Sequence, residues 1–292
     1  MNSCLRLATV RRNIASVIAF ARAAGANVDC RSGAYFTALQ ALQGHPYRIH
    51  TQREAFCLEF DVERAWVQPI LQAAAASEAD EAEATAPSSF TGFGASEQTA
   101  IARNLTAAMQ MLREFEREVP SLVRELVGCL VVAKCAGYAG GSLGNVLGVV
   151  WISPQDGWRP VDYAEHLLHE TVHQALFLDD MVNGLFTASP ARMAQDDACI
   201  TSPIRKIKRP FHAAFHAACV AAVLAGFYEQ LDIQEKTLEF QRPARQTLAE
   251  MQERRHLLTA HGRSVFEALC DSVYPPAAQT SSPAGLRARD GR

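Results

Sequence analysis

The chain has no large excess of charge of either sign, no long apolar run and no recognisable export signal. Its 28 Lys and Arg against 31 Asp and Glu give a net charge of −3, which excludes a general electrostatic attraction to nucleic acid or to an anionic membrane. No uninterrupted apolar run reaches the ~18 residues of a membrane-spanning helix, so we expect no membrane partner. Arginines interrupt the apolar stretch near the N-terminus, which argues against a signal peptide.

Paired cysteine motifs are also absent. The 8 cysteines are scattered along the chain without a CxxC pair. This pattern argues against a zinc ribbon and against the disulfide framework of a secreted protein. We therefore predict reduced thiols in a cytoplasmic protein.

The composition is that of a globular protein. Hydrophobic residues make up 49% of the 292-residue chain, which excludes disordered, collagen-like and coiled-coil classes. Residues 73–85 are rich in alanine and acidic residues, and Pro, Ser and Gly follow them, a pattern typical of a solvated connector. We predict a helical N-terminal region with this acidic connector over 1–90, a main domain over 91–275 and a disordered tail over 276–292.

Hydrophobic periodicity predicts a mostly helical chain with a few buried strands. The predicted helices cover residues 13–24, 53–75, 96–117 (with Ser96 as N-cap), 161–178, 210–230, 243–257 and 261–273. Short apolar runs rich in β-branched residues predict strands over 126–133 and 146–152. The glycine-rich segment 137–144 between them matches no phosphate-binding motif, so we expect a hairpin or wide loop beside the active site. The long irregular stretch 179–209 is typical of a functional connection.

The residues that carry chemistry begin with His169-Glu170-Thr171-Val172-His173, an HExxH motif on a predicted helix. Positions i and i+4 project from one helix face about 6 Å apart. Two imidazoles there can hold one metal ion, with Glu170 beside the metal as a catalytic residue. We predict an α+β, mostly helical fold with a zincin-like metal-binding core, in which a small sheet packs on the HExxH helix. His166, one turn upstream, is expected to pack or to support the ligands.

A metal site needs a third protein ligand. The metzincin pattern requires Gly and His three and six residues after His173, and the chain has Leu and Asp there, which excludes that class. Two histidines four apart on the next apolar helix, His212 and His216, favour a histidine ligand. The carboxylates of Asp196 and Asp197, in a loop-like segment, remain alternatives.

A cationic string leads into that helix: Ser202-Pro203-x-Arg205-x-x-x-Arg209-Pro210. An arginine at this place can pair bidentately with the carboxylate of a substrate or cosubstrate. Taken in order, Gly141-Ser142 before a strand, Leu168-His169-Glu170-x-x-His173, this string with His216 seven residues after Arg209, and Leu258-Thr259-Ala260-x-Gly262-Arg263 resemble the HExxH-motif proteins encoded with ribosomally made peptide natural products. The resemblance spans roughly residues 100–275. That family is similar in description to 2-oxoglutarate-dependent peptide β-hydroxylases.

The resemblance implies a cofactor and a cosubstrate. His169, His173 and His216 would bind Fe(II), and Arg205 or Arg209 would hold 2-oxoglutarate. Molecular oxygen would react at an open position of the iron, as facially bound iron allows. The chain departs from the usual oxygenase pattern because it lacks a clear carboxylate ligand.

The resemblance also implies a substrate. Glu170 would orient water or substrate, with support from Ser142, His166 and His212. The reaction would hydroxylate Cβ of a residue in a ribosomally made precursor peptide. The resemblance excludes the N-terminal region, and binding of a leader segment of that peptide by this region is a separate hypothesis.

Two other functions fit the same motif. In a zinc metallopeptidase, Glu170 would be the general base that activates zinc-bound water, and residues 146–152, as an edge strand, would receive an extended peptide. A zincin-like scaffold that only binds a partner is the non-enzymatic alternative. The sequence predicts no oligomeric state.

Overall fold

The structure is a computed structural model that describes residues 6–29, 33–44, 57–73, 89–135 and 138–274. Its helices are α1 (Leu7–Ala23), α2 (Ala34–Gln43), α4 (Ala95–Phe115), α5 (Val119–Leu126), α6 (Pro160–Asn183), α7 (Pro190–Met193), α8 (Phe211–Gln230), α9 (Gln234–Glu253), the 3-10 turn η2 (Arg255–Leu257) and α10 (Ala260–Val273). Its strands are β1 (Cys57–Glu59), β2 (Cys129–Val132), β3 (Gly140–Ser142), β4 (Val149–Ile152), β5 (Ile200–Thr201) and β6 (Lys208–Arg209). The described residues are mostly helical with a small mixed sheet, which confirms the α+β class.

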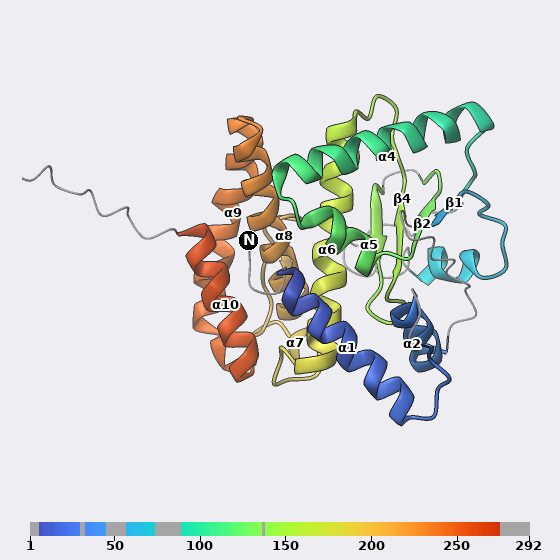
Figure 1. Cartoon of the computed structure of the whole chain (residues 1–292). Helices are drawn as coiled ribbons and strands as arrows, with labels where there is room; N and C mark the ends of the chain where they lie inside the picture. The colour runs from blue at the N-terminus through green and yellow to red at the C-terminus, as the bar shows by residue number, and fades with distance from the viewer. Residues whose placement is uncertain (1–5, 30–32, 45–56, 74–88, 136–137, 275–292) are drawn as a thin grey trace, which may run out of the picture.

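The helix with the HExxH motif, α6, lies at the centre of the molecule (Figure 1). The sheet lies on one side of α6, and α8, α9 and α10 lie on the other, while α4 runs across one end. The sheet order is β1-β2-β4-β3. Strands β1, β2 and β4 run parallel, and β3 pairs antiparallel with β4 at the edge. The glycine-rich segment 137–144, predicted as a hairpin or wide loop between the two strands, does not turn back between them, because β2 and β4 run parallel. It contains the edge strand β3, which pairs antiparallel with β4 next to α6.

Both faces of the sheet are buried. Leu130 and Val150 belong to the large core shared with the helices, whereas Val131 and Trp151 belong to a second cluster with residues 62–71. Successive side chains of a strand point to opposite faces. Strands covered on both faces read as continuous apolar runs, which is why residues 126–133 and 146–152 could be predicted as strands.

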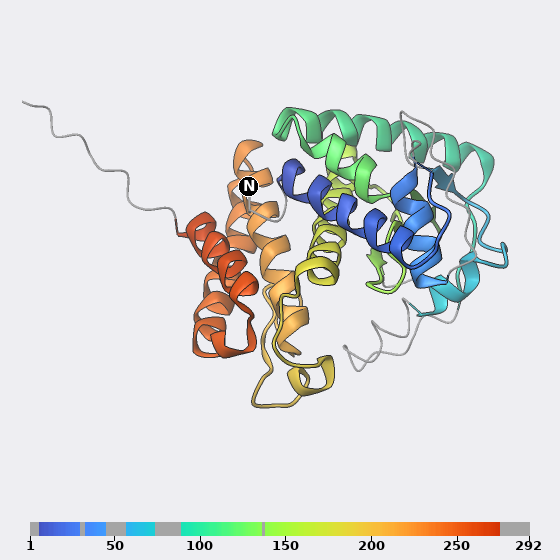
Figure 2. The ribbon, with the colours of Figure 1, turned by 60° about the horizontal axis from the view of Figure 1, so that its bottom comes forward.

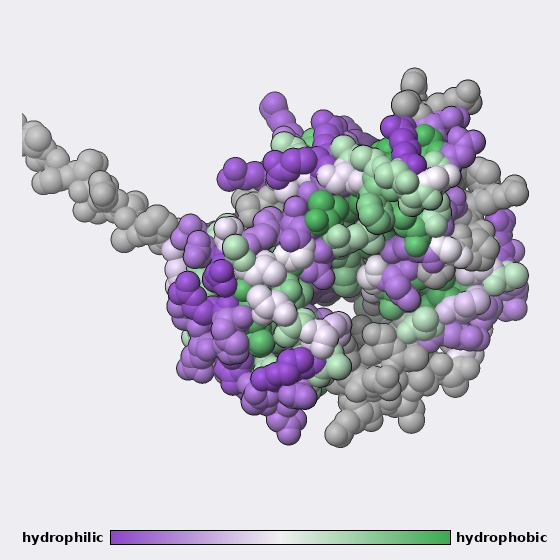
Figure 3. Space-filling view, turned by 90° about the horizontal axis from the view of Figure 1, so that it is seen from below, coloured by the Kyte–Doolittle hydropathy of each residue, from purple (hydrophilic) through white to green (hydrophobic). Residues whose placement is uncertain are grey.

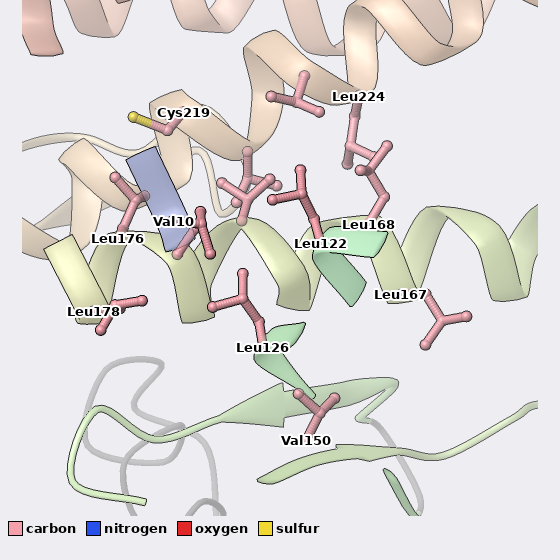
Figure 4. Packing of buried hydrophobic residues seen from close by; sticks show 14 of the residues in the cluster. Val10, Leu122, Leu126, Val150, Leu167, Leu168, Leu176, Leu178, Cys219 and Leu224 are labelled. Atoms are coloured by element: carbon pink, nitrogen blue, oxygen red, sulfur yellow. The ribbon is translucent and has the colours of Figure 1, made fainter. Parts of the chain in front are cut away.

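The large core lies between α6, α8 and the sheet (Figure 4). Leu168 and Leu176 point from α6 toward α8, while Leu167 and Leu178 point to the opposite side. Leu126 of α5 fills the space toward the sheet. Because apolar residues cover several sides of α6, the helix is buried along most of its length and its polar residues are held in fixed positions.

Helix α8 is apolar enough and long enough to cross a membrane by length and composition alone. Most of its length is buried inside the protein, as in the core helix of a soluble protein. A search for uninterrupted apolar runs does not find this helix, because His212 and His216 interrupt its apolar sequence.

Three local predictions were wrong. Residues 57–59, predicted as helix, form β1, because in-register pairing with β2 outweighs a weak helical pattern. The N-cap of α4 is Gly94 and not Ser96, and the Glu97 carboxylate accepts a hydrogen bond from Gly94 N at 2.7 Å. The segment 146–152 is no edge strand, since β4 lies between β2 and β3.

The predicted boundary near residue 90 separates segments that share one core and one sheet. Val10 and Val17 of α1 belong to the core cluster that contains the leucines of α6, and β1 pairs with β2. Figures 1 and 2 both show α1 crossing α6 with α2 beside it. Most of the predicted acidic connector, and the tail over 276–292, lie outside the described residues.

Candidate functional site

Residues at its two ends determine where the HExxH helix begins and where it stops. Pro160 occupies the first turn, where its missing N–H costs nothing. Arg159 N donates a hydrogen bond to Asp162 Oδ2 at 2.7 Å, and Gly184 follows the last turn with φ +68°. Between these ends Gln174 ties the helix to the sheet, because its Oε1 accepts a hydrogen bond from Gly148 N at 2.8 Å. The motif is therefore held against the sheet.

Glu170 faces the edge strand. Its side chain is 5% exposed, and its Oε2 accepts a hydrogen bond from Ser142 Oγ of β3 at 2.7 Å. Burial raises the pKa of Glu170 to about 7, and the Ser142 hydrogen bond opposes that rise. His169 Nε2 lies 3.8 Å from Glu170 Oε1. The structure therefore brings Ser142, Glu170 and His169 next to one another.

Three histidines from two helices form a chain of ring contacts. His173 Nε2 lies 3.2 Å from His169 Nε2. His173 Nδ1 lies 3.4 Å from His216 Nδ1, which α8 supplies. Helix packing of α6 against α8 thus joins the HExxH motif to a histidine 43 residues away in the sequence.

These imidazoles are held in the neutral form. Burial and the neighbouring His216 lower the pKa of His173 to about 3. Burial, His212 and Arg209 lower the pKa of His216 to about 3, and burial, His173 and His166 lower that of His169 well below its ordinary value. Neutral imidazole is the form that binds metal ions.

The neutral imidazoles fit a divalent transition-metal ion in chemistry and in the spacing of each nitrogen pair. Two nitrogens that share one ion, each about 2.1 Å from it, lie about 3.0–3.4 Å apart, which agrees with both contacts of His173. However, His173 contacts its two neighbours through different nitrogens, and within the described ranges no group of three potential ligands is disposed to hold one ion. A half-turn of the His173 ring about Cβ–Cγ moves Nε2 to the present place of Cε1, between its two nitrogens. One nitrogen would then face both partners.

Two phenylalanines line the histidine cluster. The ring centroid of Phe177 is 4.8 Å from that of His216 and 6.0 Å from that of His173. Phe186 lies 6.5 Å from His216, with the ring planes nearly parallel. The site therefore has an apolar wall that keeps water from part of the imidazole surface. Neither phenylalanine was predicted, although Phe177 stands four residues after His173 and so on the same helix face.

His212 lies beside the cluster rather than in it. Its ring centroid is 6.3 Å from that of Phe186, and its buried Nδ1 has no hydrogen-bond partner within the described part of the chain. Burial and Arg209 lower its pKa, while Asp180 opposes them. Of the two candidate histidines on α8, His216 is the one in contact with the HExxH motif.

The cationic string forms a hairpin of β5 and β6. The buried Ser202 accepts a hydrogen bond from Arg205 N through its Oγ, and Lys206 takes a positive φ of 60° at the turn. Glu250 of α9 anchors the hairpin by accepting hydrogen bonds from Thr201 N at 3.0 Å and Lys208 Nζ at 2.6 Å. The end of the hairpin leads directly into α8.

The hairpin separates its two arginines. Arg205 lies exposed at the turn, whereas Arg209 is half-buried on β6 just before α8. Arg209 is close enough to His212 and His216 to lower the pKa of both, and burial lowers the pKa of Arg209 itself. Of the two predicted arginines, Arg209 is the one near the histidines.

The carboxylate alternatives point elsewhere. Asp197 pairs with Arg192 through two contacts of 2.7 and 2.8 Å, and its side chain is 66% exposed. Asp196 is exposed on the same turn. Asp197 therefore stabilises a surface turn through Arg192, and Asp196 lies on that turn.

His166 has an oriented ring next to the motif. Its Nδ1 lies 2.8 Å from the carbonyl oxygen of Asp162, to which it donates a hydrogen bond. The ring lies against Trp158, with the centroids 4.3 Å apart and the ring planes tilted by 31°. His166 therefore lies one turn from His169 with its ring orientation fixed.

Figure 3 shows the molecule from below: hydrophilic side chains predominate on its left side, and hydrophobic side chains border part of a central hollow. Compared with known proteins, the chain matches no protein-family model and no curated protein.

Proposed function

We propose that this protein is an Fe(II)- and 2-oxoglutarate-dependent oxygenase that hydroxylates Cβ of a residue in a ribosomally synthesised peptide. Under this proposal the core is zincin-like: the HExxH helix packs on a sheet whose edge strand runs antiparallel. Iron(II), with 2-oxoglutarate and oxygen, supplies the oxidising chemistry that replaces a C–H bond by C–OH. His169, His173 and His216 would hold the iron.

The observation that carries the proposal is the position of Arg209. A half-buried guanidinium beside two neutral histidines favours an anionic ligand, because a cation in low dielectric is stabilised by a bidentate carboxylate. A dicarboxylate held by Arg209 would extend toward His216. Arg205, on the exposed turn, is the weaker candidate.

The remaining residues would orient the reactants and shield the histidines from water. Ser142 fixes the Glu170 carboxylate, so Glu170 would orient water or the peptide next to the ligands. Phe177 and Phe186 exclude water from one side of the histidines. His166, packed against Trp158, would contact the substrate or support His169.

Anaerobic reconstitution tests the proposal. The purified chain is loaded with Fe(II), and 2-oxoglutarate is added without oxygen. We expect one iron per chain and an iron-to-2-oxoglutarate charge-transfer band that Arg209→Ala abolishes. Arg205→Ala is the matched control on the same hairpin and should retain most of the band. Full zinc occupancy, no band and peptide cleavage would contradict the proposal.

A zinc metallopeptidase is the second candidate. It is favoured by the buried Glu170, which faces edge strand β3 through Ser142: a peptide paired with that edge would lie next to a carboxylate that can act as general base. Glu170→Gln separates the two functions. Hydrolysis should fall by several orders of magnitude, whereas hydroxylation should lose less, because Glu170 orients rather than transfers a proton.

The cytoplasmic location and the leader segment also belong to the proposal. Because α1 contributes to the core, deletion of residues 1–90 would remove core residues together with any leader site. A surface variant is the better test: Phe20 on α1 is 67% exposed. If α1 binds a leader peptide, Phe20→Ser should weaken leader binding without changing the unfolding midpoint, with the exposed Arg12→Ser on the same helix as control.

A further inference from the structure

Cys57 and Cys129 face each other across the first two strands of the sheet. They are direct partners in the parallel register of β1 and β2. Both side chains pack on the sheet face that carries Trp151, opposite the face that meets α6. Neighbouring strands lie about 4.8 Å apart, within the range of about 4.4–6.8 Å between the Cα atoms of a disulfide.

The two thiols are in contact, and one of them is accessible. Cys57 is half-buried on the outer strand, whereas Cys129 is 2% exposed. A hydrogen bond from the Cys129 thiol lowers the pKa of Cys57 to about 7, with a smaller contribution from Arg64, although burial and Glu59 oppose it. Cys57 is therefore the thiol that ionises first. Cysteines with this combination of exposure and acidity are the ones that react with oxidants.

We propose that Cys57 and Cys129 form a redox-active dithiol that a peroxide converts into a disulfide joining β1 to β2. The Cys57 thiolate attacks one peroxide oxygen, the O–O bond breaks, and Cys57 becomes a sulfenic acid with release of water or an alcohol. The Cys129 sulfur then attacks the Cys57 sulfur, the S–O bond breaks, and the hydroxyl group leaves with the Cys129 proton as water. The two thiols lose two electrons, and the peroxide gains them.

The bond would close a long loop at the edge of the sheet. Residues 57 and 129 are far apart in sequence, so a link between them restricts the unfolded chain strongly and stabilises the folded state. Cys57 is half-buried, and a disulfide that a reductant can reach is reduced more readily than a fully buried one. The pair is thus suited to reversible oxidation in a reducing compartment.

The test uses the full chain and hydrogen peroxide. After oxidation, free thiols are alkylated, and peptide masses are compared with and without dithiothreitol. We expect a linked pair of peptides containing Cys57 and Cys129, and a rise in the thermal unfolding midpoint that dithiothreitol reverses. Cys57→Ser should abolish the link, and Cys199→Ala, a half-buried thiol elsewhere, should not.

A second variant keeps the test independent of folding defects. In Cys129→Ser the Cys57 sulfenic acid should persist and react with dimedone. The inference is overturned if Cys57 and Cys129 are both recovered as alkylated thiols while Cys199 is oxidised, or if Cys57 links to another cysteine instead.

Discussion

Gly262 lies directly against the backbone of Leu185: a Cβ at Gly262 would stand 2.1 Å from the Leu185 carbonyl oxygen. Thr259 completes this contact, since its Oγ1 accepts a hydrogen bond from Gly262 N at 2.9 Å and donates one to Gly184 O at 2.7 Å. Phe186, which follows Leu185 in the chain, packs against His212 and His216. The string Leu258–Arg263 therefore fastens α10 to the end of the HExxH helix and fixes one wall of the histidine cluster.

Gly262→Ala should destabilise the protein severely. The added methyl group meets a backbone oxygen that cannot move aside without displacing α10, and we expect a loss of about 2–4 kcal/mol in the free energy of unfolding. Urea denaturation followed by circular dichroism measures it. Gly226→Ala on α8 is the control, because nothing lies within 4 Å of its Cβ position. That change should be neutral or stabilise by about 0.5–1 kcal/mol, and equal effects of the two variants would contradict the close contact.

Glu250→Gln should make the free energy of unfolding less dependent on pH between 4.5 and 2. Burial opposes ionisation of Glu250, but the hydrogen bonds from Lys208 and Thr201 outweigh it and hold its pKa at about 2, below the ordinary 4.5. A depressed carboxyl pKa stabilises the fold above pH 4.5, and this contribution disappears as the pH falls from 4.5 to 2. We expect the variant to be less stable by about 1 kcal/mol at pH 7, with the difference vanishing near pH 2.

Glu253→Gln is the matched control for this carboxylate. Its side chain is 76% exposed, and it forms an ion pair with the neighbouring Arg254 at 3.4 Å. Denaturation curves at several pH values should show no difference from the parent protein. A pH-independent loss in Glu250→Gln would mean that the hairpin is anchored by shape rather than by charge.

Asp179→Ala should loosen the junction of three helices. The Asp179 carboxylate is 1% exposed, and it accepts hydrogen bonds from Asn13 of α1, Asn183 of α6 and His261 of α10, each at 2.8 Å. Removing it leaves the buried Asn13, the partly buried His261 and the exposed Asn183 without their acceptor, and we expect a cost of about 3 kcal/mol. Thermal unfolding of Asp179→Ala against Asp271→Ala, an exposed residue of α10, measures the effect. If Asp179→Ala lowers the unfolding temperature less than Asp271→Ala does, water has replaced the carboxylate as the hydrogen-bond acceptor.

Alanine variants of the histidines should separate the metal ligands from the residue that supports a ligand. If His169, His173 and His216 are the ligands, each single replacement should abolish stoichiometric Fe(II) binding. His212→Ala should lower the affinity by about 10–100-fold, the usual cost of losing a residue that supports a ligand. Equilibrium dialysis with metal analysis gives the affinities, and circular dichroism excludes unfolding. Loss of binding in His212→Ala with retention in His216→Ala would assign the third ligand to His212.

Local sequence patterns predicted the central elements well. The HExxH helix, α8 and strands β2 and β4 have strong periodicity or continuous apolar runs, because each is buried by its neighbours. The short β1 was missed, since three residues carry no period and their pairing partner comes about 70 residues later. The amphipathic character of α5 was overlooked, as was that of α2.

The sequence by itself determined the type of side chain at the site and the spacing of His169, Glu170 and His173, because a helix fixes which residues share a face. Tertiary structure decided everything that depends on long-range packing. The meeting of α6 and α8 selects His216 over His212, the hairpin turns Arg209 toward the histidines and leaves Arg205 exposed, and strand pairing brings Ser142 to Glu170 and Cys57 to Cys129. No local pattern encodes these contacts, since each joins residues that only the packed core brings together.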